Sequence, residues 1–149
     1  MLYGLESCML LKADRVRLDS FQAKCLRKIF KIAPAFLSRV SNADVRAAAE
    51  ACPLSSCLLQ RQLNFYGKLA RGPPGSLPRA MVSQAGQDHR ILPRDWGTPR
   101  LRGRPRLQWN AYMHAQALAV AGNDPDILQA LLRGTPGQWN AAVVDYCFS

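Results

Sequence analysis

The sequence predicts an all-α protein: a small helical bundle, then a loop rich in Arg, Pro and Gly, then a short helical tail. Three observations favour this fold class. Apolar residues recur at steps of three and four through most of the chain, which is the period of an amphipathic helix. No segment of useful length alternates apolar and polar residues as a half-buried strand does. Pro, Gly and the capping residues Ser, Thr and Asp separate the periodic segments.

The strongest helix is expected from about Asp14 to Ile32. Asp14 near its start and basic residues near its end match the helix dipole, and Pro34 closes it. One face is apolar and we expect it to be buried. This apolar face comprises Leu18, Phe21, Cys25, Ile29 and Ile32. The opposite face is basic and comprises Lys24, Arg27, Lys28 and Lys31.

Two further helices follow in the first half of the chain. Ser41 with Asp44 three residues later is a variant of the capping box, and it predicts a short helix over 45–51. Ser55 or Ser56 starts the next helix, which runs to about Ala70. Its inner face comprises Leu59, Leu63, Tyr66 and Ala70, and its outer face Arg61, Asn64, Lys68 and Arg71.

The second half begins with irregular structure. Residues 72–78 form a linker rich in Pro and Gly, residues 79–82 a brief helical turn, and residues 83–104 a loop. Pro105 suits the first turn of a new helix that stops at Gly122. Its inward residues are expected to be Leu107, Ala111, Ala115 and Leu118.

Two short helices complete the tail. Asp124 caps a helix that ends at Gly134. Residues 135–138, Thr-Pro-Gly-Gln, cap the last helix, which places Trp139, Val143 and Tyr146 on one face.

The charge of the chain is high and uneven. The whole sequence carries a formal net charge of +10, and 19 of its 20 basic residues lie within residues 1–106. Residues 107–149 are slightly acidic by comparison. A strongly basic body favours a polyanionic partner, with nucleic acid as the first candidate and an anionic membrane surface as the second. Basicity that serves only solubility is the remaining alternative.

The compartment is expected to be intracellular, nuclear or cytoplasmic. No apolar run approaches the roughly 18 residues that cross a bilayer. The first residues lack a basic segment and are interrupted by Glu6, so no signal peptide is expected. Five scattered cysteines, an odd number, indicate reduced thiols.

Catalytic and metal-binding patterns are absent from the sequence. The ten acidic residues form no close carboxylate pair of the kind that two-metal phosphoryl-transfer sites use. No phosphate-binding Gly-rich loop, nucleophile elbow or zinc-protease motif occurs. Cys52 and Cys57 are too widely spaced for the usual zinc knuckle. Cys25 and His114 fit core or surface positions, so we expect no enzyme, metal or cofactor.

Arginines gather between residues 90 and 106. Arg100, Arg102, Arg104 and Arg106 lie among Pro and Gly residues that keep the backbone extended. Arg102-Gly103-Arg104-Pro105 resembles the core of an AT-hook, an element whose arginines follow the minor groove of DNA. Trp96 and Trp109 flank the cluster, either to stack on bases or to anchor the loop on the helices.

The basic helix faces favour contact with backbone phosphates. A solvated face normally mixes both signs of charge, but this face has no acid among its members Lys24, Arg27, Lys28 and Lys31. Charges of one sign repel each other along a helix unless an anion lies opposite. Phosphate contacts of this kind set affinity and salt sensitivity without reading the sequence of the nucleic acid.

Several short blocks of the sequence are informative when they are taken in order. The first two are Leu2-Tyr3-Gly4-x-Glu6 and Phe21-Gln22-x-x-Cys25-Leu26-Arg27. Val40-Ser41-Asn42-x-x-Val45 follows. The later ones are residues 61–71, Leu77-Pro78-Arg79, Gly103-Arg104-Pro105-Arg106 with Trp109, and Trp139 with the helix after it. In this order, the blocks resemble the region after the palm in non-LTR (LINE-type) retrotransposon reverse transcriptases. Cys8 and Lys68 stand where that family often has tryptophan and histidine.

The resemblance implies a domain organisation and a role. Residues 1–71 would be a thumb-like helical domain, residues 72–104 a linker, and residues 105–149 a helical C-terminal tail. The chain would be a fragment that lacks the catalytic palm and grips a template–primer duplex without chemistry of its own. Its partners would be RNA, DNA or a hybrid duplex, and the upstream palm of a longer parent protein. No membrane partner is expected.

The predicted interface combines the basic helix faces with the arginine loop. Its residues are Lys24, Arg27, Lys28, Lys31, Arg61, Lys68, Arg71, Arg100, Arg102, Arg104 and Arg106. Two alternatives remain open: an AT-hook-like DNA-binding protein, and a helical protein-interaction module with no nucleic-acid role.

Overall fold

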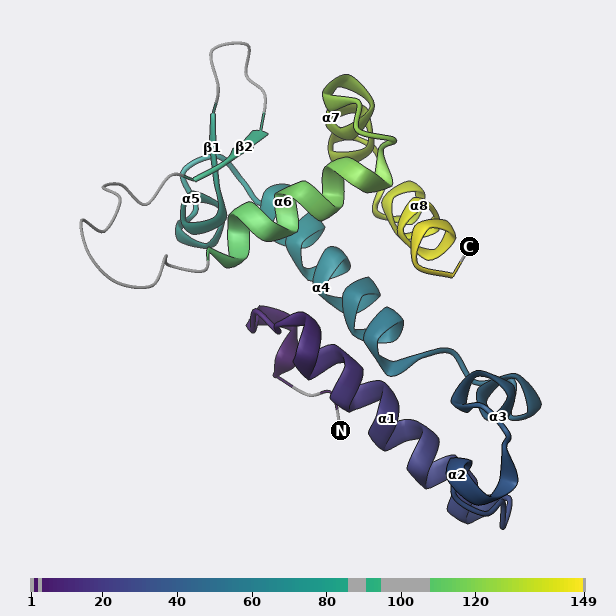
Figure 1. Cartoon of the computed structure of the whole chain (residues 1–149). Helices are drawn as coiled ribbons and strands as arrows, with labels where there is room; N and C mark the ends of the chain where they lie inside the picture. Colours follow the sequence, from purple (N-terminus) through teal and green to yellow (C-terminus); the bar gives the residue numbers. More distant parts are fainter. Residues whose placement is uncertain (1, 3, 86–90, 95–107, 149) are drawn as a thin grey trace, which may run out of the picture.

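The structure is a computed structural model that describes residue 2 and residues 4–85, 91–94 and 108–148. Over these residues it contains eight α-helices, a single 3-10 helix and a two-stranded sheet (Figure 1). The prediction of an all-α fold is therefore confirmed. The first elements are η1 (Leu5–Ser7), α1 (Lys12–Ile29), α2 (Ala35–Ser38), α3 (Asn42–Ala48) and α4 (Leu54–Ala70). Then follow α5 (Leu77–Val82), β1 (Ser83–Ala85), β2 (Ile91–Pro93), α6 (Trp109–Val120), α7 (Pro125–Arg133) and α8 (Pro136–Phe148).

Helix α4 connects the two ends of the molecule. Near its start it packs against α1, which also contacts α3 (Figure 1). Farther along, α4 packs against α5, α6 and α8, while α7 lies against α6 and α8. The α1–α3 segment therefore forms one end of the molecule, and the helices that follow α4 form the other.

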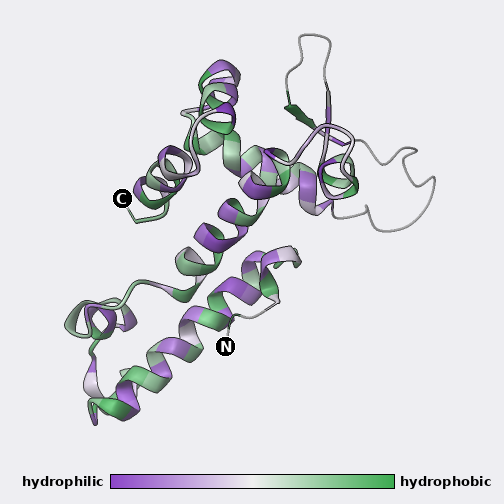
Figure 2. Ribbon diagram, turned by 180° about the vertical axis from the view of Figure 1, so that it is seen from behind, coloured by the Kyte–Doolittle hydropathy of each residue, from purple (hydrophilic) through white to green (hydrophobic). Residues whose placement is uncertain are grey.

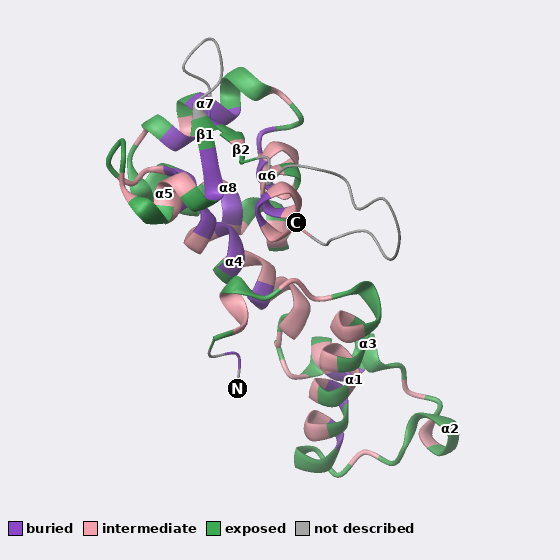
Figure 3. Cartoon of the chain, turned by 90° about the vertical axis from the view of Figure 1, so that its left-hand side faces the viewer, coloured by how far each residue is buried: buried purple, intermediate pink, exposed green. Residues whose placement is uncertain are grey.

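The hydrophobic core lies at the second of these ends. It contains Leu63, Tyr66 and Ala70 of α4 together with buried residues from every later helix and Ile91 of β2. Figure 3 shows the same concentration of buried residues along α4 and α8. The core joins α4 to Val82, Ile91 and the tail helices.

A glycine in α4 allows α8 to approach closely. A Cβ atom at Gly67 would lie 2.4 Å from Nε1 of Trp139. That Nε1–H donates to the backbone carbonyl of Leu63 at 3.2 Å, and Trp139 is 1% exposed. The indole ring therefore occupies the space that any larger residue would need at position 67.

The predicted caps are confirmed. The Ser41 hydroxyl accepts from the backbone N–H of Asp44, whose carboxylate accepts in return from the N–H of Ser41. Asp124 caps α7 by accepting from the N–H of Asp126 at 2.8 Å. Thr135 and Gln138 make reciprocal bonds at the start of α8, through Oγ1 and Oε1.

The buried face of α1 differs from the prediction. Its buried residues are Ala23 and Arg27, whereas Phe21 is 45% and Ile29 is 70% exposed. Polar residues of α1 make the contacts instead: Asp19 accepts from the N–H and hydroxyl of Ser55. The Gln22 side chain donates to the carbonyl of Cys52 and accepts from the N–H of Leu54, the first residue of α4. The polar side of α1 therefore contacts the start of α4, and the predicted apolar face stays partly exposed to solvent.

Two other expectations are corrected. The inner face of α6 is formed by Asn110, Met113 and Ala117, whereas Ala115 is exposed. The helix is apolar on most sides, so periodicity does not select a face. The predicted loop contains an antiparallel hairpin with Ser83 paired to Pro93, whose strands of three residues each are too short to show alternation.

Candidate nucleic-acid interface

Three lysines form an unpaired basic row at the end of α1. Lys24 and Lys28 are one helical turn apart, and Lys31 follows just beyond the helix with a φ of 54°. All three side chains are exposed, and none forms an ion pair with any residue that the structure describes. We call Lys24, Lys28 and Lys31 the lysine row.

Arg27 does not belong to this row. It is 7% exposed, and its guanidinium donates to the backbone carbonyls of Ala33 and Val40 and to the side chains of Ser38 and Asn42. These bonds hold the segment after α1 against the helix. The guanidinium of Arg27 is thus engaged within the protein.

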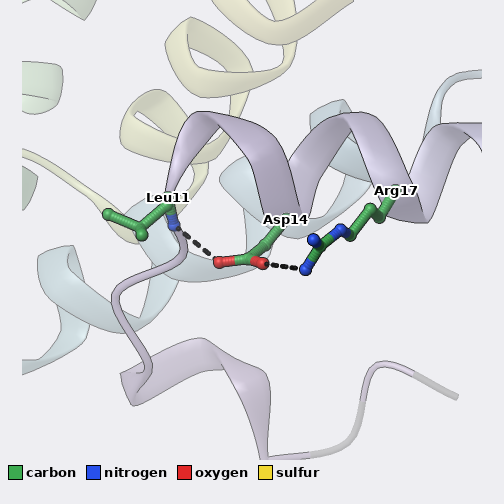
Figure 4. A network of polar contacts seen from close by, with 3 residues as sticks. All are labelled: Leu11, Asp14 and Arg17. Carbon is green, nitrogen blue, oxygen red and sulfur yellow. Dashed lines mark hydrogen bonds and ion pairs between the residues drawn. The ribbon is translucent and has the colours of Figure 1, made fainter.

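Two other basic residues, Arg17 and Arg61, form ion pairs within the protein. Arg17 forms an ion pair with Asp14 at 3.4 Å, and the same carboxylate accepts from the backbone N–H of Leu11 at 3.3 Å (Figure 4). Arg61 of α4 pairs with Glu6 of η1 at 2.5 Å. Their charges are compensated within the protein, in contrast to those of the lysine row.

The basic residues of α4 lie farther along the molecule. Lys68 is exposed on the last turn of α4. Arg71 caps the C-terminus of α4, and its Nη1 is buried without a hydrogen-bond partner. Burial lowers the pKa of Arg71 below its ordinary value. The lysine row and Arg71 thus lie towards opposite ends of the molecule, at the α2–α3 end and the α5 end (Figure 1).

Arg71 and two further arginines line a pocket at the end of α4. Its volume is about 440 Å³, and its described lining consists of Ala70, Arg71, Arg79, Ile91, Leu132 and Arg133. Nη1 of Arg79 donates to the carbonyl of Gly72 at 2.9 Å, which fixes that side chain at the rim. We call this the arginine pocket. None of these lining residues is acidic.

Arg79 and Arg133 are absent from the residues predicted from the sequence. They stand on α5 and α7, 54 positions apart, and only the packing of these helices on the end of α4 brings them together. No spacing rule in the sequence signals such a cluster.

The arginine loop cannot be placed in this interface. Arg100, Arg102, Arg104 and Arg106 lie outside the described residues, as does Trp96. Trp109 packs with its ring 5.9 Å from that of Phe65 and 6.4 Å from that of Tyr66. This position matches the anchoring role that the sequence left open for Trp109.

Apolar side chains are also exposed at the α2 end. Ile29 is 70%, Phe36 82% and Leu37 66% exposed. The hydropathy colouring shows apolar residues interspersed with hydrophilic ones in this region (Figure 2). The lysine row and these three residues therefore belong to the same end of the molecule.

Two searches of the described part of the chain bear on other kinds of site. It contains no group of three or more His, Cys, Asp or Glu side chains placed to hold a metal ion. None of its helices is both long and apolar enough to cross a membrane. Within residues 4–85 and 108–148, all five cysteines are free.

Comparison with known proteins finds no significant match to this chain. No family model, no curated protein and no solved structure matches this chain significantly.

Proposed function

We propose that the chain binds the phosphate backbone of a nucleic acid, as a non-catalytic fragment of a non-LTR retrotransposon reverse transcriptase. The partner is RNA, DNA or a hybrid duplex in an intracellular compartment. The upstream palm of a longer parent protein is the proposed second partner. The blocks that resemble the thumb region of this family support the assignment, together with the charge of the chain.

The observation that carries the proposal is the lysine row. Three exposed cations on successive turns have no carboxylate partner among the described residues, although Arg17 and Arg61 both have one. Such a row repels itself, and a row of phosphates removes that repulsion while releasing condensed counterions. A neutral hydrogen-bond acceptor would bind these three lysines more weakly than a polyanion does, because hydrogen bonds between charged groups are stronger.

A matched pair of variants tests the proposal. Lys24→Gln/Lys28→Gln removes two charges from the row, and Lys12→Gln/Arg17→Gln removes two from the other end of the same helix. At about 50 mM salt we expect the first variant to bind a fluorescent RNA–DNA hybrid roughly tenfold to a hundredfold more weakly than the wild type. The control should stay within about threefold, because its charges lie outside the row and Arg17 is already paired.

Two results would contradict the proposal. One is the absence of hybrid, DNA or RNA binding by the wild-type chain at low salt. The other is an equal loss of affinity in both variants, which would show that net charge matters and the lysine row does not.

The exposed apolar residues favour a second candidate, a helical protein-interaction module. Ile29, Phe36 and Leu37 are each more than 60% exposed, and aliphatic and aromatic side chains gathered on a surface are typical of interaction sites. This candidate predicts that the wild type self-associates in sedimentation experiments and that Phe36→Ser/Leu37→Ser abolishes the association. It also predicts that neither the wild type nor this variant binds nucleic acid. Hybrid binding lost in the lysine-row variant would exclude it as the sole function.

A further inference from the structure

We propose that residues 21–39, which we call the α1–α2 surface, bind a single-stranded segment of nucleic acid whose bases stack on exposed phenylalanine rings. This proposal rests on the proposed function, because the lysine row supplies the phosphate contacts, and it names the form of nucleic acid that the surface binds. The chain has five phenylalanines. Three of them stand on this surface, each at least 45% exposed: Phe21, Phe30 and Phe36.

Phe21 lies on the same face of α1 as two members of the lysine row. Lys24 and Lys28 follow it by three and seven positions, and residues at these spacings share one side of a helix. The three side chains extend over about 10 Å along the helix axis. Phe21 is 45% exposed, and both lysines are exposed. A strand that places its phosphates on the two lysines therefore passes beside this ring.

Phe36 of α2 is held near the end of α1 by the buried guanidinium of Arg27. The carbonyl of Ala33 and the hydroxyl of Ser38, which bracket Phe36 in the sequence, both accept from Nη1 of Arg27, at 2.9 and 3.3 Å. The backbone of α2 is thereby fixed next to the last turn of α1, while the side chain of Phe36 is 82% exposed. The ring is therefore available to a partner that contacts the lysine row.

Unpaired cations stand on both sides of Phe36. Lys31 precedes it by five positions and Arg39 follows it by three. Both side chains are exposed, and neither forms an ion pair with a residue that the structure describes. Over residues 24–53, six basic residues stand against two acidic ones, of which Asp44 is used to cap α3. The charge of the surface therefore favours an anionic partner.

The aromatic rings favour a single strand over a duplex. Inside a duplex each base is stacked between its neighbours, so a ring beside the phosphates has no base face to contact. An unpaired strand offers its base faces, and surfaces that bind single strands combine a basic groove with aromatic side chains on which the bases stack. The α1–α2 surface presents both of these features together.

Phe36→Leu tests the stacking contact, because leucine keeps an apolar side chain on the surface and removes the ring. The probes are a labelled DNA strand of about 12 nucleotides and the same strand paired with its complement. At about 50 mM salt we expect Phe36→Leu to bind the single strand at least about fivefold more weakly than the wild type and to bind the duplex equally well. Phe36→Trp should restore single-strand binding. Leu37→Ala, at the neighbouring exposed position, is the matched control and should bind both probes as the wild type does.

The proposal is overturned if Phe36→Leu keeps full affinity for the single strand, or if it weakens binding of both probes equally. Either result, with duplex binding that depends on Lys24 and Lys28, contradicts only the stacking contact and leaves the proposed function in place. If the wild type binds neither probe, both proposals are wrong. If it binds no single strand but self-associates, or sediments with phosphatidylserine vesicles, then a second copy or an anionic membrane covers the rings and the proposal is wrong.

Discussion

Gly67 determines how closely the last helix packs against α4. The ring of Trp139 lies where a side chain at position 67 would begin, with Nε1 2.4 Å and Cε2 2.8 Å from the ideal Cβ position. Glycine is normally unfavourable inside a helix. Here the close approach of an aromatic ring compensates for that cost by burying Trp139 completely.

We predict that Gly67→Ala destabilises the protein by roughly 1–3 kcal/mol, because Trp139 must move and disturb the core. Urea unfolding monitored by tryptophan fluorescence measures the change. Gly137→Ala in α8 is the control, because the added Cβ atom would contact only Oγ1 of Thr135, at 4.0 Å. Its stability should be unchanged or slightly higher, and equal losses in the two variants would contradict this account.

A second residue-scale feature is the pair formed by Tyr66 and His114. Tyr66 Oη and His114 Nδ1 lie 2.9 Å apart between α4 and α6. Burial lowers the pKa of His114 below its ordinary value of 6.5 and raises that of Tyr66. Both groups are therefore neutral in the folded protein at neutral pH.

This shift predicts a pH dependence of stability. Well above pH 6.5 His114 is neutral in both states and contributes no pH dependence. As the pH falls below that value, the unfolded chain takes up a proton more readily than the folded one, so stability decreases. Tm measured from about pH 7.5 down to about 5.5 should fall in the wild type and fall less in His114→Gln. An identical decrease in the two proteins would refute the role of this pair.

At the scale of elements, the α1–α3 end is held by polar contacts more than by apolar burial. Asp19 and Gln22 bond to the start of α4, and Arg27 bonds to the segment between α1 and α3. Buried Gln62 of α4 donates to the carbonyls of Leu5 and Cys8, which fixes η1. The guanidinium of Arg15 lies over the ring of Tyr112 in α6.

Arg27→Met tests this description of the α1–α3 end. The variant leaves the carbonyls of Ala33 and Val40 and the amide of Asn42 without their donor, and we expect a loss of roughly 2–3 kcal/mol in unfolding free energy. Chemical denaturation followed by circular dichroism provides the measurement. Lys28→Met on the neighbouring exposed position should change stability by less than about 0.5 kcal/mol. A variant Arg27→Met as stable as Lys28→Met would show that the guanidinium is dispensable.

Local sequence signals predicted the elements better than their faces. Capping residues such as Ser41, Asp124 and Thr135 act within three residues of themselves, so the sequence was sufficient to locate those helix starts. The inner face of α4 was also predicted, because Leu63, Tyr66 and Ala70 have polar residues on the opposite side. In α1 the buried position of Arg27 depends on its bonds to Ala33 and Val40, which tertiary packing brings to the helix, and periodicity along α1 does not signal them.

At the scale of the whole molecule, the core and the basic residues are distributed unequally. The large buried side chains cluster where α4 meets the tail helices, while the lysine row stands at the α2–α3 end. The lysine row was predicted because its charges are of one sign along one helix. The arginine pocket was not, because its three members come from helices that meet only in the folded chain.

The most direct test of the central claim is the salt dependence of hybrid binding. With roughly six phosphate contacts, the wild type should lose on the order of a thousandfold in affinity between about 50 and 200 mM salt. Removing two contacts in Lys24→Gln/Lys28→Gln should reduce the slope of log affinity against log salt by about 1.8. Lys12→Gln/Arg17→Gln should keep the wild-type slope. A flat salt dependence in the wild type, or an unchanged slope in the lysine-row variant, would contradict backbone phosphate contact at this surface.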